Sequence, residues 1–382
     1  MVKITALEGS PLGTITGFVG ASPFGAVLDP AAEARIARYE LQAVSRDLLG
    51  KSRLRVCLLC MVPGAAGVKV LHNPSRGSAH YGNLVVCGLL WVCPVCAAKI
   101  SERRRDEITQ AIAIWESRGG VVLIGAYTFS HGPSEALREA LGRFVVAQRS
   151  MGQNKAYLGL LSDYGVSGTV RVLETTWGEA NGWHPHRHML FFLDGSKSVD
   201  VADFEDRLYG AWSRAALGKG LTMDREHGVK VQGSWVAIAD YLAKWGQMPT
   251  RRVWDASDEM TKGHLKRDRS GMRYTPFDLL RSVADVGDAD HARLFREYAA
   301  AFYRKRQLRW SPGLRELLGL DVEKDDEQLA REEQDDALLL MLLTVDEWRA
   351  VKRHNLRAQV LEVARSGDAA AVAAFVAGVV AL

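Results

Sequence analysis

Apolar runs and alternating apolar and polar positions predict four strands in the middle of the chain. The stretch VVLIGAYTF at 121–129 is almost wholly apolar, which indicates a buried strand. Residues 168–177 and 183–193 are rich in β-branched and aromatic side chains, and EANG between them predicts a tight turn. A short fourth strand is predicted at VKVQG, residues 229–233. We therefore expect the second and third strands to form a hairpin.

Apolar residues that recur every three or four positions predict helices around these strands. The predicted helices span 33–49, 97–119, 134–152, 200–218 and 234–246. From residue 121 onward the order is β-α-β-β-α-β-α, which predicts an antiparallel sheet with helices packed on one side. This α+β arrangement is close to the ferredoxin-like plan.

Changes of composition along the chain predict five regions. They are a partly disordered, partly helical N-terminus at 1–50, a cysteine-rich module at 51–118, the α+β domain at 119–250, a basic helical extension at 251–320 and an acidic helical tail at 321–382. The longest apolar run, at 369–382, has 14 residues, fewer than the roughly 20 that cross a bilayer. The first residues also lack an apolar leader, so we expect a cytoplasmic protein without a membrane partner.

The chain has an ordinary globular composition, 47% hydrophobic and 25% charged, and a formal net charge of +4. Residues 321–382 contain 13 acidic and 7 basic residues, a net charge of −6, so residues 1–320 carry +10. Basic clusters interleaved with aromatic residues suit contacts to phosphates and bases, although a solvated helix face explains each cluster alone equally well. The candidate DNA-binding residues are Arg103, Arg104, Arg105, Lys266, Arg267, Arg304, Lys305 and Arg306.

All five cysteines lie between residues 57 and 96, which indicates one local site. Two CxxC motifs, CLLC and CPVC, are typical of a tetrahedral zinc site. An odd number of cysteines in a cytoplasmic protein disfavours structural disulfides. The candidate zinc ligands are Cys57, Cys60, Cys93 and Cys96, with Cys87, His72 and His80 as alternatives.

Three histidines occupy alternate positions of one predicted strand: His184, His186 and His188. Because successive side chains of a strand point to opposite faces, the three imidazoles share one face. A half-exposed strand explains a single histidine, but three at this spacing favour a metal site. In a hairpin, Glu174 comes beside them as a further ligand candidate, although an exposed strand acid would have the same pattern. Two imidazoles and a carboxylate leave positions open on a divalent ion, where a phosphoryl oxygen can be polarised.

Tyr241 and Lys244 are three residues apart in the helix predicted at 234–246 and therefore share one face. A tyrosine hydroxyl can act as a covalent nucleophile, and the Lys244 ammonium would then lie near the phenol oxygen or the scissile phosphate. A boundary aromatic of an amphipathic helix is the alternative for Tyr241. The histidines favour the catalytic interpretation.

Together these motifs resemble rolling-circle replication initiators of the HUH endonuclease superfamily. The resemblance rests on TFSH at 128–131, the histidine strand and the YxxK helix, in that order. The flanking segments CGLLWVCPVCAAKISERRR, YTPFDLL and LRWSPGLRELLGL resemble plasmid replication proteins of high-GC Gram-positive bacteria. The resemblance covers residues 50–320 and implies an HUH endonuclease domain at 119–250.

Carried over to this chain, the resemblance implies that His186 and His188 ligate a catalytic Mg²⁺ or Mn²⁺, with His184 flanking them. It implies that Tyr241 attacks a phosphodiester of the origin. The products would be a 5′-phosphotyrosine and a free 3′-hydroxyl, which a host polymerase extends.

Residues 128–131 also match the family's first motif, through Thr128, Ser130 and His131, with a structural or DNA-positioning role. Two positions depart from the family pattern. Arg187 stands between the paired histidines, where relatives have an apolar residue. Ala237 stands four residues before the tyrosine, where some relatives have a glutamate that activates water, so the route of termination stays open.

The resemblance therefore predicts a metal-dependent nickase that starts rolling-circle replication at a plasmid origin. Its implied partners are single-stranded or hairpin origin DNA, a host helicase and a host DNA polymerase, and its implied structural ion is Zn²⁺. Two alternatives remain. One is a single-strand DNA transposase with the same catalytic motifs, and the other is a non-catalytic, zinc-dependent DNA-binding regulator with structural histidines.

Overall fold

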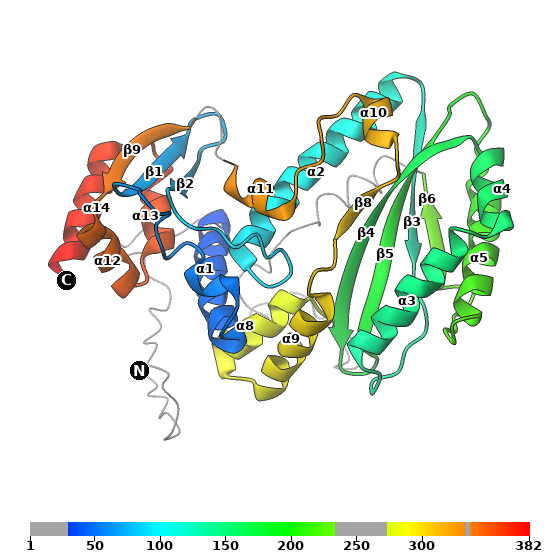
Figure 1. The fold of residues 1–382 in the computed structure, drawn as a ribbon, viewed down its shortest axis with the longest axis horizontal. Helices are drawn as coiled ribbons and strands as arrows, with labels where there is room; N and C mark the ends of the chain where they lie inside the picture. The colour runs from blue at the N-terminus through cyan, green and yellow to red at the C-terminus, as the bar shows by residue number, and fades with distance from the viewer. Residues whose placement is uncertain (1–29, 234–272, 333–336) are drawn as a thin grey trace, which may run out of the picture.

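The computed structural model describes residues 30–233, 273–332 and 337–382. It is a mixed α/β structure with two antiparallel sheets. The smaller sheet lies at one end of the elongated molecule, the larger sheet lies at the other, and a group of helices lies between them (Figure 1). No helix in these ranges combines the length and the apolar character that crossing a bilayer requires.

The larger sheet contains the four strands predicted in the middle of the chain. The strand order is β6-β3-β5-β4-β7, and β8 pairs with β4. The strands are β3 (Val121–Tyr127), β4 (Val166–Gly178), β5 (Gly182–Leu193), β6 (Val229–Gln232), β7 (Arg273–Tyr274) and β8 (Leu308–Trp310). The hairpin of β4 and β5 is confirmed, because the two strands pair from the turn to their far ends.

Gly182 begins β5 at the hairpin turn. Its φ of +72° lies in the left-handed region, which favours glycine. A Cβ at this position would also lie 2.9 Å from the Cα of Pro133. Glycine therefore lets the segment that follows His131 approach the start of the histidine strand.

Helices cover both faces of the larger sheet, so the prediction of helices on one side is wrong. One face packs against α3 (Leu137–Met151), α4 (Lys155–Asp163) and α5 (Val201–Leu217), and the other against α2 (Pro94–Ser117) and α10 (Leu314–Leu318). Along β5, Met189 and Phe191 enter the first core, whereas Leu190 and Phe192 enter the second. The order of elements does not reveal that a helix before the first strand covers the second face.

The middle of the molecule consists of helices that join the two sheets (Figure 1). They are α1 (Pro30–Leu49), α8 (Pro276–Val286), α9 (Ala289–Phe302) and α11 (Asp326–Arg331), with a 3₁₀ helix at Arg53–Val56. Trp91 packs edge-on against Phe302 at 4.6 Å between ring centroids, and its indole N–H donates to the carbonyl of Lys305. The residues just before α2 are thus tied to α9 and the loop after it.

The smaller sheet joins the cysteine-rich region to the acidic tail. Its order is β2-β1-β9. The elements are β1 (Val68–Asn73), β2 (Ser78–Gly82) and β9 (Leu338–Leu343), with α12 (Val345–Arg353), α13 (Arg357–Ala364) and α14 (Ala369–Ala381) beside them. The tail was expected to be helical, but it supplies one strand to this sheet. The run LLLMLL has no period-two alternation that would predict a strand.

Buried polar contacts reinforce that junction. The Arg357 side chain is 2% exposed. It donates to the side chain of Gln42 in α1 and to the carbonyl of Leu58, while the Tyr81 hydroxyl donates to the Arg357 carbonyl. Residues 276 to 315 positions apart in sequence therefore share one core. The five-region division of the chain stays a prediction.

Candidate functional site

Glu174, His186 and His188 come together on one face of the β4–β5 hairpin. Glu174 is directly opposite His186 in the strand register, and Val172 is opposite His188. The Glu174 Oε2 atom lies 3.3 Å from His186 Nε2 and 3.6 Å from His188 Nε2. Their candidate donor atoms all lie within 4.8 Å of one another. The arrangement can hold a metal ion with two nitrogen ligands and one oxygen ligand.

The hydrogen bonds of His186 indicate which ring nitrogen faces Glu174. Its Nδ1 lies 3.1 Å from the carbonyl oxygen of His184. A carbonyl only accepts, so Nδ1 carries a proton towards the backbone, and Nε2 is the ring nitrogen that faces Glu174. This is the pattern by which an outer hydrogen bond orients a metal-binding imidazole.

His188 is kept neutral by its surroundings. Burial is the main cause that lowers its pKa to about 4; the charge of Glu174 opposes this shift, and the neighbouring His186 adds to it. Neutral imidazole is the form that binds a metal. The side chains of His186, His188 and Glu174 are 15%, 22% and 27% exposed, so the group is accessible to a substrate.

His184, the third histidine of the strand, is engaged elsewhere. Its Nδ1 lies 2.6 Å from Nε2 of His131, and the other ring nitrogen of His131 lies 2.6 Å from the Asn181 carbonyl. Burial, with His186 and His131, lowers the pKa of His184 to about 3. The histidine predicted as a flanking residue therefore links the TFSH segment to the hairpin.

The rest of the TFSH segment is held by the loop before β6. The Thr128 hydroxyl donates to the His227 carbonyl at 2.5 Å, and the Ser130 N–H donates to the Thr222 carbonyl at 2.7 Å. These contacts place His131 beside the histidine strand. Thr128 and Ser130 act on the segment's position and do not contact the group of Glu174, His186 and His188.

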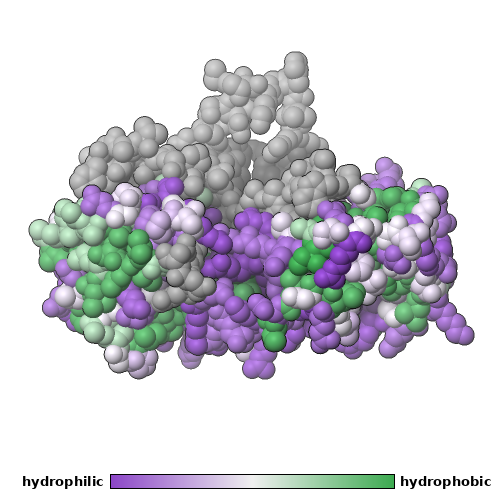
Figure 2. Space-filling model, turned by 90° about the horizontal axis from the view of Figure 1, so that it is seen from above, coloured by the Kyte–Doolittle hydropathy of each residue, from purple (hydrophilic) through white to green (hydrophobic). Residues whose placement is uncertain are grey.

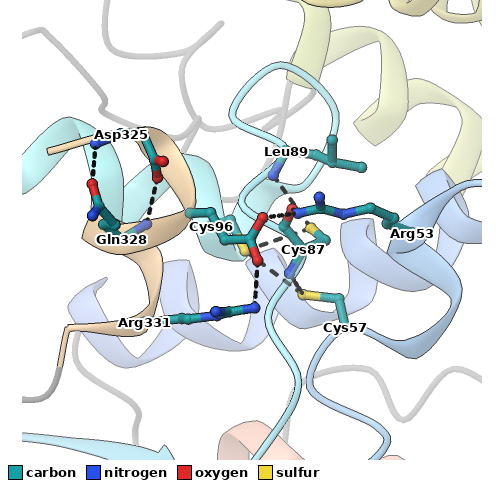
Figure 3. Close-up of polar contacts among 9 residues, drawn as sticks. Arg53, Cys57, Cys87, Leu89, Cys96, Asp325, Gln328 and Arg331 are labelled. Carbon is teal, nitrogen blue, oxygen red and sulfur yellow. Dashed lines mark hydrogen bonds and ion pairs between the residues drawn. The ribbon is translucent and has the colours of Figure 1, made fainter.

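Four of the five cysteines form a buried cluster: Cys57, Cys87, Cys93 and Cys96. Figure 3 shows three of them drawn together next to α11. Their sulfurs are 3.6 Å apart for Cys57–Cys96 and Cys87–Cys96, and 3.9 Å apart for Cys57–Cys93. A tetrahedral ion with Zn–S bonds of about 2.3 Å places sulfurs about 3.8 Å apart. The cluster therefore fits a tetrahedral thiolate site.

Donors around the cluster also suit thiolates. The Gln42 amide donates to the Cys93 sulfur at 3.3 Å, and the Cys87 N–H donates to the Cys57 sulfur at 3.4 Å. Burial raises the pKa of the Cys93 thiol, but its hydrogen bonds to the other three cysteines outweigh burial and the net shift is downward, whereas hydrogen bonds within the cluster raise the pKa of Cys87 and Cys96. Such donors stabilise negative sulfur in a core that excludes water.

Cys60 is exposed and lies outside the cluster, and Cys87 occupies the fourth position. The spacing of CLLC predicted Cys60 as a ligand and Cys87 as an alternative. Leu58 between them adopts a φ of +53°, and the chain then turns so that Cys60 faces outward. The signal that could have identified Cys87 is its place in the apolar run LVVCGLL, which marks a buried thiol.

Two of the predicted DNA-binding arginines pair with acidic residues of the tail. Arg103 Nε lies 3.2 Å from Glu332 Oε2, and Arg104, 5% exposed, forms an ion pair with Asp326.

Seen from above, hydrophilic residues gather over the middle of the molecule (Figure 2). On α2, Arg105 is half-buried, and Arg304, Lys305 and Arg306 are exposed between α9 and β8. Lys266, Arg267, Tyr241 and Lys244 lie outside the described residues.

Curated proteins from Streptomyces are similar to this chain. "Protein rep" of Streptomyces lividans is 29% identical over 374 residues, and the match covers 80% of each chain. "Neomycin resistance protein" of Streptomyces cyanogenus is 27% identical over 154 residues, which cover 34% of this chain and 35% of that protein. No family model matches the chain, and no solved structure matches it.

Proposed function

We propose that this protein is a replication initiator that nicks one strand of a plasmid origin. The observation that carries the proposal is the accessible group of Glu174, His186 and His188, in a chain that is similar along most of its length to a protein named for replication. A non-catalytic regulator has no need of two imidazoles and a carboxylate that leave positions open on an ion. The fold would then be that of an HUH endonuclease, with the histidine pair on its central hairpin.

In this proposal His186, His188 and Glu174 hold Mg²⁺ or Mn²⁺ against the scissile phosphate. The ion would polarise a phosphoryl oxygen and stabilise charge that develops on it. The hydrogen bond to the His184 carbonyl keeps the His186 ring in place, and His131 keeps His184 in place. The hairpin would thus present the ion on side chains whose orientation is fixed by hydrogen bonds.

Tyr241 is the proposed nucleophile, on the evidence of the sequence alone. Its phenol oxygen bonds to phosphorus and gives up its proton, while the bond from phosphorus to the 3′-oxygen breaks and that oxygen takes up a proton. The products are a 5′-phosphotyrosine and a free 3′-hydroxyl, and no water is consumed. Lys244, three residues later in the helix that the sequence predicts at 234–246, would neutralise charge near the phenol or the phosphate.

The four clustered cysteines, Cys57, Cys87, Cys93 and Cys96, are proposed to hold a structural Zn²⁺. All their positions on a tetrahedral ion are filled by protein, which leaves none for a substrate. The partners of the proposed reaction are single-stranded or hairpin origin DNA, with a host helicase and DNA polymerase acting on the free 3′-end.

The decisive test is formation of a covalent adduct. Protein incubated with single-stranded origin DNA and Mn²⁺ should give an SDS-resistant complex, which Tyr241→Phe should eliminate. Tyr209→Phe is the matched control, because Tyr209 lies in α5 against Arg225, outside the candidate DNA-binding clusters, and this variant should form the complex normally. DNA binding without any adduct in the wild type would favour the regulator over the nickase.

The way the reaction ends can be tested with the same adduct. Ala237 stands where a carboxylate would activate water, so the adduct should resist hydrolysis and be resolved by the 3′-hydroxyl of a DNA strand. Asp240→Asn should leave the adduct lifetime nearly unchanged, since adjacent residues of the predicted helix would point about 100° apart. Rapid hydrolysis that Asp240→Asn slows would show that Asp240 activates water.

A further inference from the structure

Three arginines gather on the face of the hairpin opposite the histidines. Arg187 lies between His186 and His188 in β5 and therefore points to the other side of the sheet. Arg171 of β4 is paired with Met189, two positions from Arg187, and Arg309 of β8 is paired directly with Arg171. The three side chains thus occupy neighbouring positions on three adjacent strands.

Like charges at such positions destabilise a sheet unless an opposite charge accompanies them. Among the described residues, no carboxylate forms an ion pair with Arg171, Arg187 or Arg309. The Nε atoms of Arg171 and Arg187 are buried and have no hydrogen-bond partner among the residues that the structure describes. Guanidinium groups keep their positive charge in proteins, so the cluster is a concentration of positive charge without an ion-paired carboxylate among the described residues.

Aromatic side chains cover the inner side of the arginine cluster, and its outer side is exposed to solvent. The guanidinium of Arg187 lies 5.9 Å from the ring centroid of Phe144 in α3. The buried side chains of Tyr127 and Tyr157 lie next to the cluster, and their hydroxyls contact the Met189 sulfur at 3.8 and 3.7 Å. Arg171 and Arg187 are half-buried, and Arg309 is exposed. An anion can therefore reach the cluster from solvent and meet preformed donors.

We propose that Arg171, Arg187 and Arg309 form a binding site for a phosphate group of the nucleic-acid backbone. Guanidinium groups match phosphate oxygens with paired N–H donors and are weakly hydrated, so they bind phosphate well in partly buried places. The site is separate from the metal group, because the sheet lies between them.

The neighbouring sequence favours a polymer over a small anion. Arg309 follows the exposed basic segment Arg304–Arg306 by three residues, so further exposed positive charges lie close to the cluster in sequence. A backbone with one phosphate per nucleotide can follow such a path, whereas a free phosphate would occupy only the cluster. The choice of nucleic acid as the source of the phosphate rests on the proposed function.

Phosphate binding would explain why position 187 has an arginine, where the family pattern has an apolar residue. An apolar residue at this position would complete the core above Phe144, whereas arginine places a charge there at the cost of burial. One strand would then carry metal ligands on one face and a backbone contact on the other. Such a strand would hold a second stretch of DNA while the first is cut.

The salt dependence of DNA binding tests the proposal. Binding of a labelled oligothymidylate would be measured from about 50 to about 200 mM salt for the wild type, Arg171→Gln and Arg309→Gln. Each variant should bind about tenfold more weakly, the loss expected for one charged hydrogen-bond contact. Each should also lower the slope of log affinity against log salt by about 0.7. Arg207→Gln, which removes the same charge from an arginine paired with Asp163, should change neither quantity.

Two further measurements separate the outcomes. Inorganic phosphate should raise the melting temperature of the wild type more than that of Arg309→Gln. Stabilisation by phosphate with unchanged DNA binding in the variants would overturn the nucleic-acid assignment, and the absence of both effects would overturn the site. Adduct formation at Tyr241, assayed in parallel, tests the nickase separately, since oligothymidylate binding needs no cleavage. Arg187→Lys, which keeps the charge, should weaken binding less than Arg187→Met if its fold is intact by circular dichroism.

Discussion

The cysteine cluster and the histidine–glutamate group are both candidate metal centres, but they differ in burial and in the number of ligands that they offer to an ion. The four clustered cysteines are at most 3% exposed, whereas the side chains of the other group are 15–27% exposed. Four thiolates saturate a tetrahedral ion, while two imidazoles and a carboxylate do not. A closed site holds a fold together, and an open site leaves room for a substrate.

The two groups also differ in how the chain assembles them. Glu174, His186 and His188 come from one hairpin, within 15 residues of sequence. The cysteines come from three segments between 57 and 96, and α1, α11 and α13 surround them. Loss of the open group should therefore abolish activity and spare the fold, whereas loss of the closed group should destabilise the fold around it.

The largest effect is expected for Cys93→Ser. Removing one buried thiolate should release the ion and unfold the module around it, since binding of structural zinc in small domains contributes about 10 kcal/mol or more. Elemental analysis should find one tightly held zinc per wild-type chain and none in the variant, with a lower melting temperature.

Cys60→Ser is the matched control for that substitution. Cys60 is exposed and lies outside the cluster, so zinc content and melting temperature should stay at wild-type values. Loss of zinc in Cys60→Ser with retention in Cys87→Ser would show that the CxxC spacing, and not the observed cluster, describes the site.

The next effect is expected for His188→Ala. Cleavage of origin DNA should fall at least about 100-fold, since loss of even an outer partner of a ligand costs about 10–100-fold. The free energy of unfolding should change by less than about 1 kcal/mol, and DNA affinity should persist. His227→Ala removes a histidine that is 73% exposed and should cleave normally. Full activity of His188→Ala would end the metal hypothesis for this group.

Chelation should distinguish the two centres by rate. EDTA should abolish cleavage within the time of mixing, because the open group is accessible, while the thiolate-bound zinc should remain until the protein unfolds. Added Mn²⁺ should then restore cleavage. Simultaneous loss of both ions, followed by zinc-dependent recovery, would contradict the difference in accessibility.

A smaller effect is expected from acid, through His80 in β2. Burial, with Lys99 and Arg103, lowers the pKa of His80 to about 4, whereas the unfolded value is about 6.5. Between these values the unfolded chain binds the proton more tightly, so stability falls as the pH decreases from 6.5 towards 4. Between pH 7 and pH 5 the wild type should lose about 1–2 kcal/mol more than His80→Gln. Denaturant unfolding at both pH values measures the difference, and equal losses would show that His80 is not the responsible group.

The sequence by itself determined the local features of this protein. The period-two spacing of His184, His186 and His188 assigned them to one face, because side-chain direction in a strand depends only on position. The turn at EANG placed the hairpin, and the helical periods located α1, α2, α3 and α5 to within a few residues. Each of these properties follows from neighbours along the chain.

Only the tertiary structure decided which distant groups meet. Cys87 takes the place that the motif assigns to Cys60, and His131 pairs with His184. β9 of the acidic tail pairs with β1, some 270 residues earlier in the chain. Such contacts depend on how whole faces pack and bury their apolar area, which is a property of the assembled core. Local sequence patterns predict which side chains share one face of a helix or strand, but only the tertiary fold determines which distant faces pack together.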